Sequence, residues 1–135
     1  MFGPALHLRQ SFFDNLLRSL REGQPLRLFT DEWRTPLSLQ TAATELIRIA
    51  RASHTGLFHL GGPERMDRFE MGRRLAAYLG IETGALEPCL RADVNFSEPR
   101  PADLSLDSTH WRETFPDSRF PDWEAALAEM QVAAT

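Results

Sequence analysis

Hydrophobic residues recur at helical spacing in three long stretches of the chain, which predicts three amphipathic helices. The first stretch runs from Leu8 to Glu22, and Gly23 follows it as a residue suited to end a helix in the left-handed conformation. The side chains expected to face the core are Leu8, Phe12, Phe13, Leu16, Leu17 and Leu20. We therefore expect an amphipathic helix over this stretch.

The second helix has the clearest start signal, because Thr35 suits the N-cap position and Pro36 suits the first helical position. Its hydrophobic face consists of Leu39, Ala42, Ala43, Leu46, Ile47 and Ala50. Such a face is normally buried in a globular protein. We expect it to pack against the rest of the chain.

The third helix is predicted to begin after Asp67, which is followed by Glu70 at the spacing of a capping box, and to end at Gly80. Its inner stripe consists of Met71, Leu75, Tyr78 and Leu79. A last, shorter helix fits the stretch from Pro121 to Met130. In that helix Trp123, Leu127 and Met130 are expected to point inward.

Three short hydrophobic runs indicate strands, namely Leu26 to Phe29, Leu57 to Gly62 and Leu86 to Leu90. The second run, "LFHLGG", is bounded by glycines and is expected to be a buried strand, with His59 hydrogen-bonded in the core. Short strands form only marginally stable sheets by themselves. This run is therefore expected to lie beside strands that the chain does not contain.

The positive charge of the chain comes entirely from 15 arginines, and the formal net charge is -4. The absence of lysine excludes a phosphate-loop lysine, a Schiff-base lysine and a Tyr-x-x-x-Lys proton relay within this sequence. A net negative charge gives no general attraction to nucleic acids or anionic bilayers. We expect neither nucleic acid nor a membrane as a partner.

The single cysteine, Cys89, excludes an internal disulfide framework and a zinc site of several thiolates. No hydrophobic run approaches the roughly 20 residues that span a bilayer. The first residues, "MFGPALHLRQ", lack the layout of a signal peptide. These features favour a cytoplasmic protein.

No set of residues in the sequence has the spacing of a catalytic or metal site. The histidines are scattered, and none lies four residues from another on one helix. The pair Gly61-Gly62 precedes a helix, but the acidic cap Asp67 would repel a phosphate, so a turn after a strand is the better interpretation. Cys89 is expected to be an inert thiol and Tyr78 a packing residue. We therefore predict no catalytic residue and no metal ligand.

Two arginines lie on restrained backbone and are the candidate binding residues. Arg34 comes just before the second helix in "DEWRTPLSL", and Arg100 lies between two prolines in "EPRPADLSLD". Such a pair suits a diphosphate, whose oxygens accept bidentate bonds. The alternative is that each arginine pairs with a local carboxylate. The local acids are Asp31 or Glu32 for Arg34, and Glu98 or Asp103 for Arg100.

The order of "FGP", "LFTDEWRTPLSLQTAATELIRIA", "GLFHLGGPERMDRFEMGRRLAAYLG" and "RPADLSLD" resembles the C-terminal half of extended short-chain dehydrogenase/reductases. The resemblance is greatest to the dTDP-4-dehydrorhamnose reductase group and covers Phe2 to about Met130. It implies an α/β fold, the C-terminal lobe of an extended Rossmann-type reductase. One lobe over residues 1–135 would then hold mainly helices and two or three short strands, without the dinucleotide-binding sheet.

The same resemblance implies roles for particular residues. Phe2, Gly3 and Pro4 would form the loop near the nicotinamide, and Arg34 and Arg100 would contact the diphosphate of a nucleotide-sugar. The glycine-rich turn and the Tyr-x-x-x-Lys of the family are missing, since Glu82 stands four residues after Tyr78. This chain alone is therefore expected to bind no cofactor, whereas the complete enzyme would use NAD(P).

Two hypotheses follow. The chain is the substrate-binding portion of an NAD(P)-dependent sugar-nucleotide reductase or epimerase, without catalytic residues of its own. The alternative is a non-enzymatic protein-interaction module derived from that lobe. The expected partners are a nucleotide-sugar substrate and either a separate NAD(P)-binding half or a homodimer mate.

Overall fold

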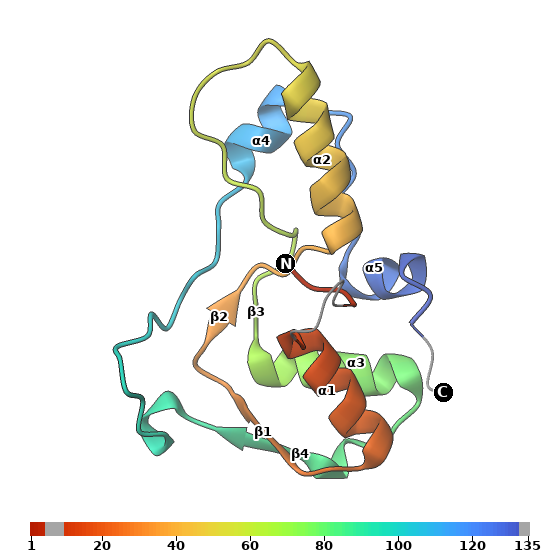
Figure 1. Cartoon of the computed structure of the whole chain (residues 1–135), viewed down its shortest axis with the longest axis vertical. Helices are drawn as coiled ribbons and strands as arrows, with labels where there is room; N and C mark the ends of the chain where they lie inside the picture. The colour runs from red at the N-terminus through yellow and green to blue at the C-terminus, as the bar shows by residue number, and fades with distance from the viewer. Residues whose placement is uncertain (5–9, 133–135) are drawn as a thin grey trace.

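The main body of the protein lies at one end of its longest axis, where three helices and a parallel pair of strands pack together (Figure 1). The helices are α1 (Phe12–Glu22), α3 (Arg68–Leu79) and α5 (Trp123–Glu129). The strands β1 (Leu26–Phe29) and β4 (Leu86–Cys89) pair in parallel, with Leu26 opposite Leu86. The computed structural model describes residues 1–4 and 10–132.

A second, smaller pair of strands lies where the body meets the rest of the chain. β2 (Trp33–Arg34) runs antiparallel to β3 (Met66–Asp67), so that Arg34 lies opposite Met66. Two short 3-10 helices flank β4, namely η1 (Thr83–Ala85) and η2 (Arg91–Asp93).

The hydrophobic core joins the helices and strands of the main body. Its fully buried side chains include Leu16 of α1, Leu75 of α3 and Leu127 of α5, each with 0% exposure. The other buried members of this core are Phe2, Phe13, Leu20, Leu28, Met66, Met71, Ala76, Leu79, Leu86, Trp123 and Ala126. Burial of this continuous hydrophobic surface is the main stabilising contribution to the body.

The capping residues account for the ends of α1 and α3. Ser11 caps α1, whereas the predicted start at Leu8 lies outside the described residues. Asp67 caps α3 by accepting from the Glu70 amide at 2.7 Å, as predicted, although the Glu70 carboxylate binds Arg73. Gly23 and Gly80 end the two helices in the left-handed conformation, with φ of 63° and 67°.

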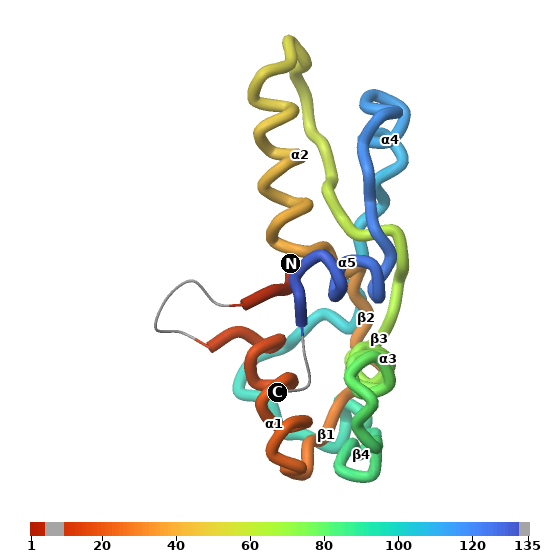
Figure 2. Tube along the Cα trace, turned by 90° about the vertical axis from the view of Figure 1, so that its right-hand side faces the viewer, coloured from red at the N-terminus to blue at the C-terminus, as the bar shows by residue number. Residues whose placement is uncertain are grey.

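α2 (Leu39–Arg51) and α4 (Thr109–Thr114) extend together away from the body (Figure 2). The two helices are joined by the buried carboxylate of Glu45, which accepts from the Trp111 indole at 3.2 Å. The sequence analysis missed α4, a short helix with little hydrophobic periodicity.

Two predictions for α2 were wrong. Its N-cap is Ser38 rather than Thr35, because the Thr35 hydroxyl accepts a hydrogen bond from the amide of Leu106 at 3.0 Å. Its hydrophobic face is not buried, since Leu46 and Ile47 are 54% and 53% exposed. The helix instead turns a side with Thr41, Ala42 and Glu45 toward the protein.

The expected buried strand at Leu57 to Gly62 is an extended segment without a strand partner among the described residues. Leu57 is 79% exposed, and His59 is also exposed rather than buried in the core. The segment is held instead by Phe58, whose ring stacks on His110 of α4 at 4.7 Å. A hydrophobic run can be buried only where a neighbouring element covers it.

The remaining elements agree with the sequence analysis in most respects. β1 and β4 occur where strands were predicted, and α5 occupies most of the last predicted helix. Tyr78 is an exception, because its 36% exposure places it at the surface rather than on the inner stripe of α3. Within the described part of the chain, no helix is long and hydrophobic enough to cross a membrane.

Candidate functional site

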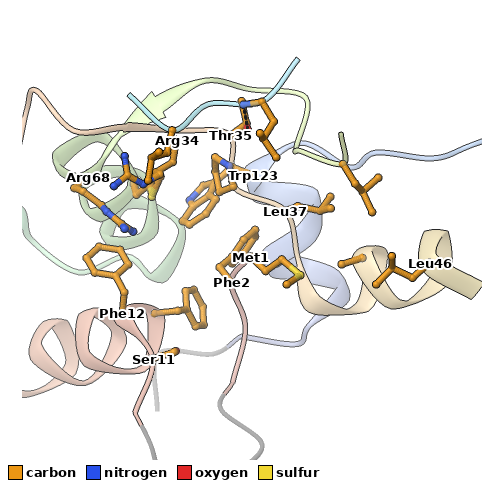
Figure 3. A pocket seen from close by; sticks show the side chains of 17 residues that line it. Met1, Phe2, Ser11, Phe12, Arg34, Thr35, Leu37, Leu46, Arg68 and Trp123 are labelled. Carbon is orange, nitrogen blue, oxygen red and sulfur yellow. Dashed lines mark hydrogen bonds between the residues drawn. The ribbon is translucent and has the colours of Figure 1, made fainter. Parts of the chain in front are cut away.

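A cavity of about 500 Å³ lies where α1, α2, α3 and α5 approach the extended segment that follows β2 (Figure 3). Its wall contains two cations, Arg34 and Arg68. The other lining residues are Met1, Phe2, Ser11, Phe12, Phe13, Thr35, Pro36, Leu37, Ala42, Leu46, Leu60, Met71, Leu104, Leu106 and Trp123. The cavity is therefore mostly hydrophobic, and the positive charges of Arg34 and Arg68 lie together in one part of its wall.

Glu32 holds the two arginines of the cavity together. Its carboxylate is buried, with 6% side-chain exposure, and its Oε1 accepts from Arg34 Nη2 at 2.7 Å and from Arg68 Nε at 3.1 Å. Arg34 comes from β2 and Arg68 begins α3, so the pairing of β2 with β3 brings them together. Figure 3 shows both guanidinium groups at the same end of the cavity.

The electrostatics of this group leave one net positive charge. Burial lowers the pKa of Arg34, and the neighbouring Glu32 partly offsets that effect while Arg68 lowers the pKa further. The guanidinium remains charged, because an arginine pKa lies far above neutral pH. Two guanidinium groups facing one carboxylate favour an anion in the cavity.

Aromatic rings form a large part of the hydrophobic wall. Phe2 lies against Trp123 with 4.4 Å between ring centroids, and against Phe13 with 5.5 Å. The Phe12 ring lies beneath the Arg68 guanidinium, 4.1 Å from its central carbon. Phe2, Phe13 and Trp123 are buried, so the partly exposed Phe12 is the ring that a ligand could contact while its anionic group reaches the arginines.

The loop "FGP" begins at the same cavity. Phe2 is buried, and its backbone amide donates to the Leu37 carbonyl at 2.8 Å while its carbonyl accepts from the Leu39 amide at 2.9 Å. Gly3 has a φ of 144°, which disfavours other residues, and Pro4 is exposed. The structure thus places Phe2 on the wall that also holds Arg34.

Arg100 lies elsewhere, on a cavity of about 380 Å³ beside Arg91 and Phe96. Its guanidinium is 5.1 Å from the Phe96 ring centroid, and its backbone carbonyl accepts from Arg91. The structure therefore does not bring Arg100 and Arg34 into one cavity.

Only one of the two candidate arginines pairs with a nearby carboxylate among the described residues. Arg34 pairs with Glu32, as the alternative interpretation expected. Asp103 pairs with Arg65 at 2.7 Å rather than with Arg100. The described residues provide no ion pair for Arg100.

The Gly61-Gly62 turn is packed against the backbone of another segment. A Cβ added to Gly62 would lie 1.7 Å from the Pro36 carbonyl oxygen, so packing against backbone already fills the space beside this glycine. The start of α3 is occupied by the Asp67 carboxylate. A diphosphate therefore cannot be held by the Gly61-Gly62 turn.

No group of metal-ligating side chains is found within residues 1–4 and 10–132. Cys89 is buried in β4, where burial raises the pKa of its thiol above the usual range. These findings agree with the prediction of an inert thiol.

The sequence named Glu32 only as a possible partner of Arg34, and it did not indicate Arg68 as a member of the site. The two residues are 36 positions apart, and only the pairing of β2 with β3 brings them together. Arg68 comes directly after the predicted cap Asp67, which places it at the start of a helix. That position is the sequence feature from which Arg68 could have been chosen as a candidate.

Comparison with known proteins shows related sequences and folds. A family model described as the RmlD substrate binding domain matches residues 5–135. The probable low-salt glycan biosynthesis reductase Agl14 of Haloferax volcanii is 25% identical over 115 residues, which cover 85% of this chain and 38% of that protein.

Solved structures of two dTDP-4-dehydrorhamnose reductases share the fold. The enzyme from Bacillus anthracis in complex with NADP has a TM-score of 0.80 at 15% identity, over 93% of this chain and 44% of that one. The enzyme from Yersinia enterocolitica has a TM-score of 0.77 at 19% identity, over 90% of this chain and 42% of that one. The chain thus spans less than half the length of the relatives it matches.

Proposed function

The chain belongs to the RmlD substrate binding domain family, and from that membership we propose that it is the substrate-binding portion of an NAD(P)-dependent sugar-nucleotide reductase or epimerase. The named relatives include a glycan biosynthesis reductase and dTDP-4-dehydrorhamnose reductases, which supports a nucleotide-sugar as the ligand. The complete protein would belong to the extended short-chain dehydrogenase/reductases.

The observation that carries this proposal is the cavity with a cationic end and an aromatic wall. A nucleotide-sugar has an anionic diphosphate joined to rings that pack on hydrophobic surface. The group formed by Arg34, Arg68 and Glu32 suits the diphosphate, whereas the hydrophobic lining, which includes Phe12 and Leu46, suits a ring.

We assign Arg34 to one wall of the nucleotide-sugar site. Arg100, which lines a separate cavity, stays a proposed contact with the diphosphate that its own substitution tests. Phe2, Gly3 and Pro4 would lie near the nicotinamide of the complete enzyme. Because the sequence lacks the glycine-rich turn and the Tyr-x-x-x-Lys of the family, NAD(P) and the proton donor would come from another part of the complete enzyme.

The test is the affinity for a dTDP-sugar in a complex of this chain with a cofactor-binding half from a related reductase. Substitutions Arg34→Ala and Arg100→Ala are each expected to weaken binding by about tenfold, because each removes a positive charge that attracts the diphosphate. Arg112→Ala is the matched control, since this exposed arginine of α4 bonds only to Thr109. Unchanged affinity in both substituted chains would remove the proposed role of these arginines.

The exposed hydrophobic face of α2 favours a second candidate function, a non-enzymatic protein-interaction module. Leu46 and Ile47 are more than half exposed, and Leu39 is 37% exposed. Exposed hydrophobic patches often mark protein interfaces. Native mass measured over a range of concentrations tests this candidate, because a stable homodimer would favour it and a strictly monomeric chain would count against it.

The predicted cytoplasmic location and the interpretation of residues 1–135 as a single lobe both stay predictions. Fractionation of source cells with an antibody against the chain would test the location. Limited proteolysis would test the single lobe, since one cooperative unit gives few early cleavages between α2 and α3.

A further inference from the structure

We propose that Arg68 makes the direct contact with a phosphoryl group in the 500 Å³ cavity, while Arg34 is held mainly by the protein itself. This inference rests on the proposed function, because the phosphoryl group is that of the nucleotide-sugar. It adds a binding residue that the sequence did not indicate.

The hydrogen bonds of Arg34 are largely satisfied within the protein. Its Nη1 donates to the Trp33 carbonyl at 2.6 Å and lies 3.4 Å from the Ala102 carbonyl. Its Nη2 donates to Glu32 at 2.7 Å. A ligand would have to compete with these acceptors for the N–H groups of Arg34.

Arg68 differs because only its Nε is bonded, to Glu32 at 3.1 Å. Its terminal Nη1 and Nη2 have no hydrogen-bond acceptor within residues 1–4 and 10–132. The side chain is 24% exposed and lines the cavity, so these terminal groups remain available to a ligand. An oxyanion with two oxygens could accept from both of them.

Two contacts restrain the Arg68 guanidinium. Glu32 binds its Nε on one side, and the Phe12 ring lies 4.1 Å from its central carbon. Figure 3 shows Arg68 between Arg34 and Phe12, at the opposite end of the cavity from Leu46. A restrained guanidinium loses less conformational freedom when it binds, which strengthens ligand contact.

The local charge also favours a phosphoryl group over a neutral one. Arg34 and Arg68 carry two positive charges, and Glu32 supplies one negative charge. One positive charge therefore remains uncompensated within this group. Thymidine carries no phosphate and would not be attracted by this charge, whereas the anions dTDP and pyrophosphate would be.

Calorimetric titration of the full chain with dTDP, pyrophosphate and thymidine tests the inference. Arg68→Gln is expected to weaken dTDP and pyrophosphate binding by about tenfold or more and to leave thymidine binding unchanged. The matched control is Arg73→Gln, since Arg73 lies one turn further along α3, pairs with Glu70 and does not line the cavity. The control should bind dTDP within about twofold of the original chain.

A second measurement needs no substitution and remains decisive if Arg68→Gln fails to fold. Phenylglyoxal modifies accessible arginines, and mass spectrometry of peptides reports the rate at each position. Saturating dTDP should slow modification of Arg68 by about tenfold while Arg73 reacts as before, because a bound phosphoryl group blocks the Nη atoms.

The outcomes separate the inference from the proposed function. If dTDP binds and neither the Arg68→Gln affinity nor the Arg68 modification rate changes, the inference is wrong and the proposed function stands. If pyrophosphate binds through Arg68 but dTDP binds no better than pyrophosphate, the phosphoryl site stands and the nucleotide-sugar function is wrong. If neither ligand binds, both are wrong.

Discussion

Glu32 determines how the cationic end of the cavity is arranged. A carboxylate with 6% exposure is costly to bury unless it is paired, and Arg34 and Arg68 together provide that pairing. Two charge-assisted hydrogen bonds thus offset the desolvation cost of burying the Glu32 carboxylate. The same bonds fix both guanidinium groups against the cavity wall.

Asp103 gives a pH-dependent test at the residue scale. Hydrogen bonds from Ser105 and Arg65 lower the pKa of Asp103 from 3.8 to about 2. Because the folded state has the lower pKa, its stabilising contribution is present above pH 3.8 and is lost as the pH falls through 2. An NMR titration of the Asp103 carboxyl should show its midpoint near 2.

Arg65→Gln provides the comparison for Asp103. It removes a hydrogen bond and a positive charge, so the pKa of Asp103 should rise toward its ordinary value. A midpoint near 3.8 in the unsubstituted protein would contradict the described contacts.

Individual residues show what local sequence could reveal about the site. Arg34 was recognised because its neighbours restrain the backbone, which is a property of adjacent positions. Arg68 was not recognised, because its hydrogen bond to Glu32 depends on two strands pairing and joins residues 36 positions apart. The position of Arg100 was also inaccessible, since the course of the loop between η2 and α4 has no periodic pattern.

At the scale of elements, Arg74 joins α3 to α5 and to the segment before β3. Its guanidinium donates to Glu64 at 2.8 Å and to Glu124 at 2.7 Å, and Glu64 also accepts from the Trp123 amide at 2.8 Å. The hydrogen bonds to both carboxylates raise the pKa of Arg74. This group fixes the position of Trp123 on the cavity wall.

Arg74→Ala is therefore expected to destabilise the protein by about 1–3 kcal/mol, since two carboxylates lose a partly buried partner. Urea unfolding gives this difference directly. Arg73→Ala on the same helix should cost less than about 0.5 kcal/mol, because its pair with Glu70 is exposed. Equal losses in the two proteins would show that Arg74 has no special role.

Gly62 shows a close approach between two segments that only glycine permits. Any Cβ at this position would lie 1.7 Å from the Pro36 carbonyl oxygen, where the Gly62 amide already donates to Thr35 at 3.1 Å. The contact sets the path of the chain beside Thr35 and Leu37, both of which line the cavity.

We expect Gly62→Ala to reduce the free energy of unfolding by about 1–3 kcal/mol or more, because backbone must move to admit the methyl group. Gly84→Ala is the control, since nothing lies within 4 Å of its added Cβ. That control should change stability by less than about 0.5 kcal/mol. Similar thermal unfolding of both variants would contradict the close approach at Gly62.

Helices and strands were predicted correctly where capping residues, glycines or hydrophobic runs lie within the element or next to it. The Asp67 cap, the glycines that end α1 and α3, and the hydrophobic run of β1 all act through neighbouring residues. The start of α2 was misplaced because the Thr35 hydroxyl binds the amide of Leu106, which lies 71 positions away. No local pattern indicates such a partner.

At the scale of the whole molecule, the protein has a well-packed body and a less covered extension (Figures 1 and 2). The sequence predicted a buried face on α2 and a buried strand at Leu57 to Gly62. Most of the α2 face is exposed, and the segment from Leu57 to Gly62 is only partly covered, because it has no strand partner among the described residues. Hydrophobic pattern indicates which face can be buried, and the neighbouring structure decides whether it is.

Substitutions on α2 distinguish this exposed surface from the core. Leu46→Gln and Ile47→Gln should each change the free energy of unfolding by less than about 0.5 kcal/mol, because both side chains are more than half exposed. Leu75→Ala should cost about 2–5 kcal/mol, since Leu75 has 0% exposure. Comparable losses at Ile47 and Leu75 would mean that α2 is covered in the folded protein.

The position of the nucleotide-sugar site is the central claim, and NMR mapping of dTDP on the isotopically labelled chain tests it most directly. We expect dTDP to shift the indole N–H signal of Trp123 and the backbone amides of Phe2 and Leu37, which line the cavity. The indole signal of Trp111, buried beside Glu45 between α2 and α4, should stay unchanged. Shifts confined to other surfaces, or none at saturating dTDP, would contradict the account.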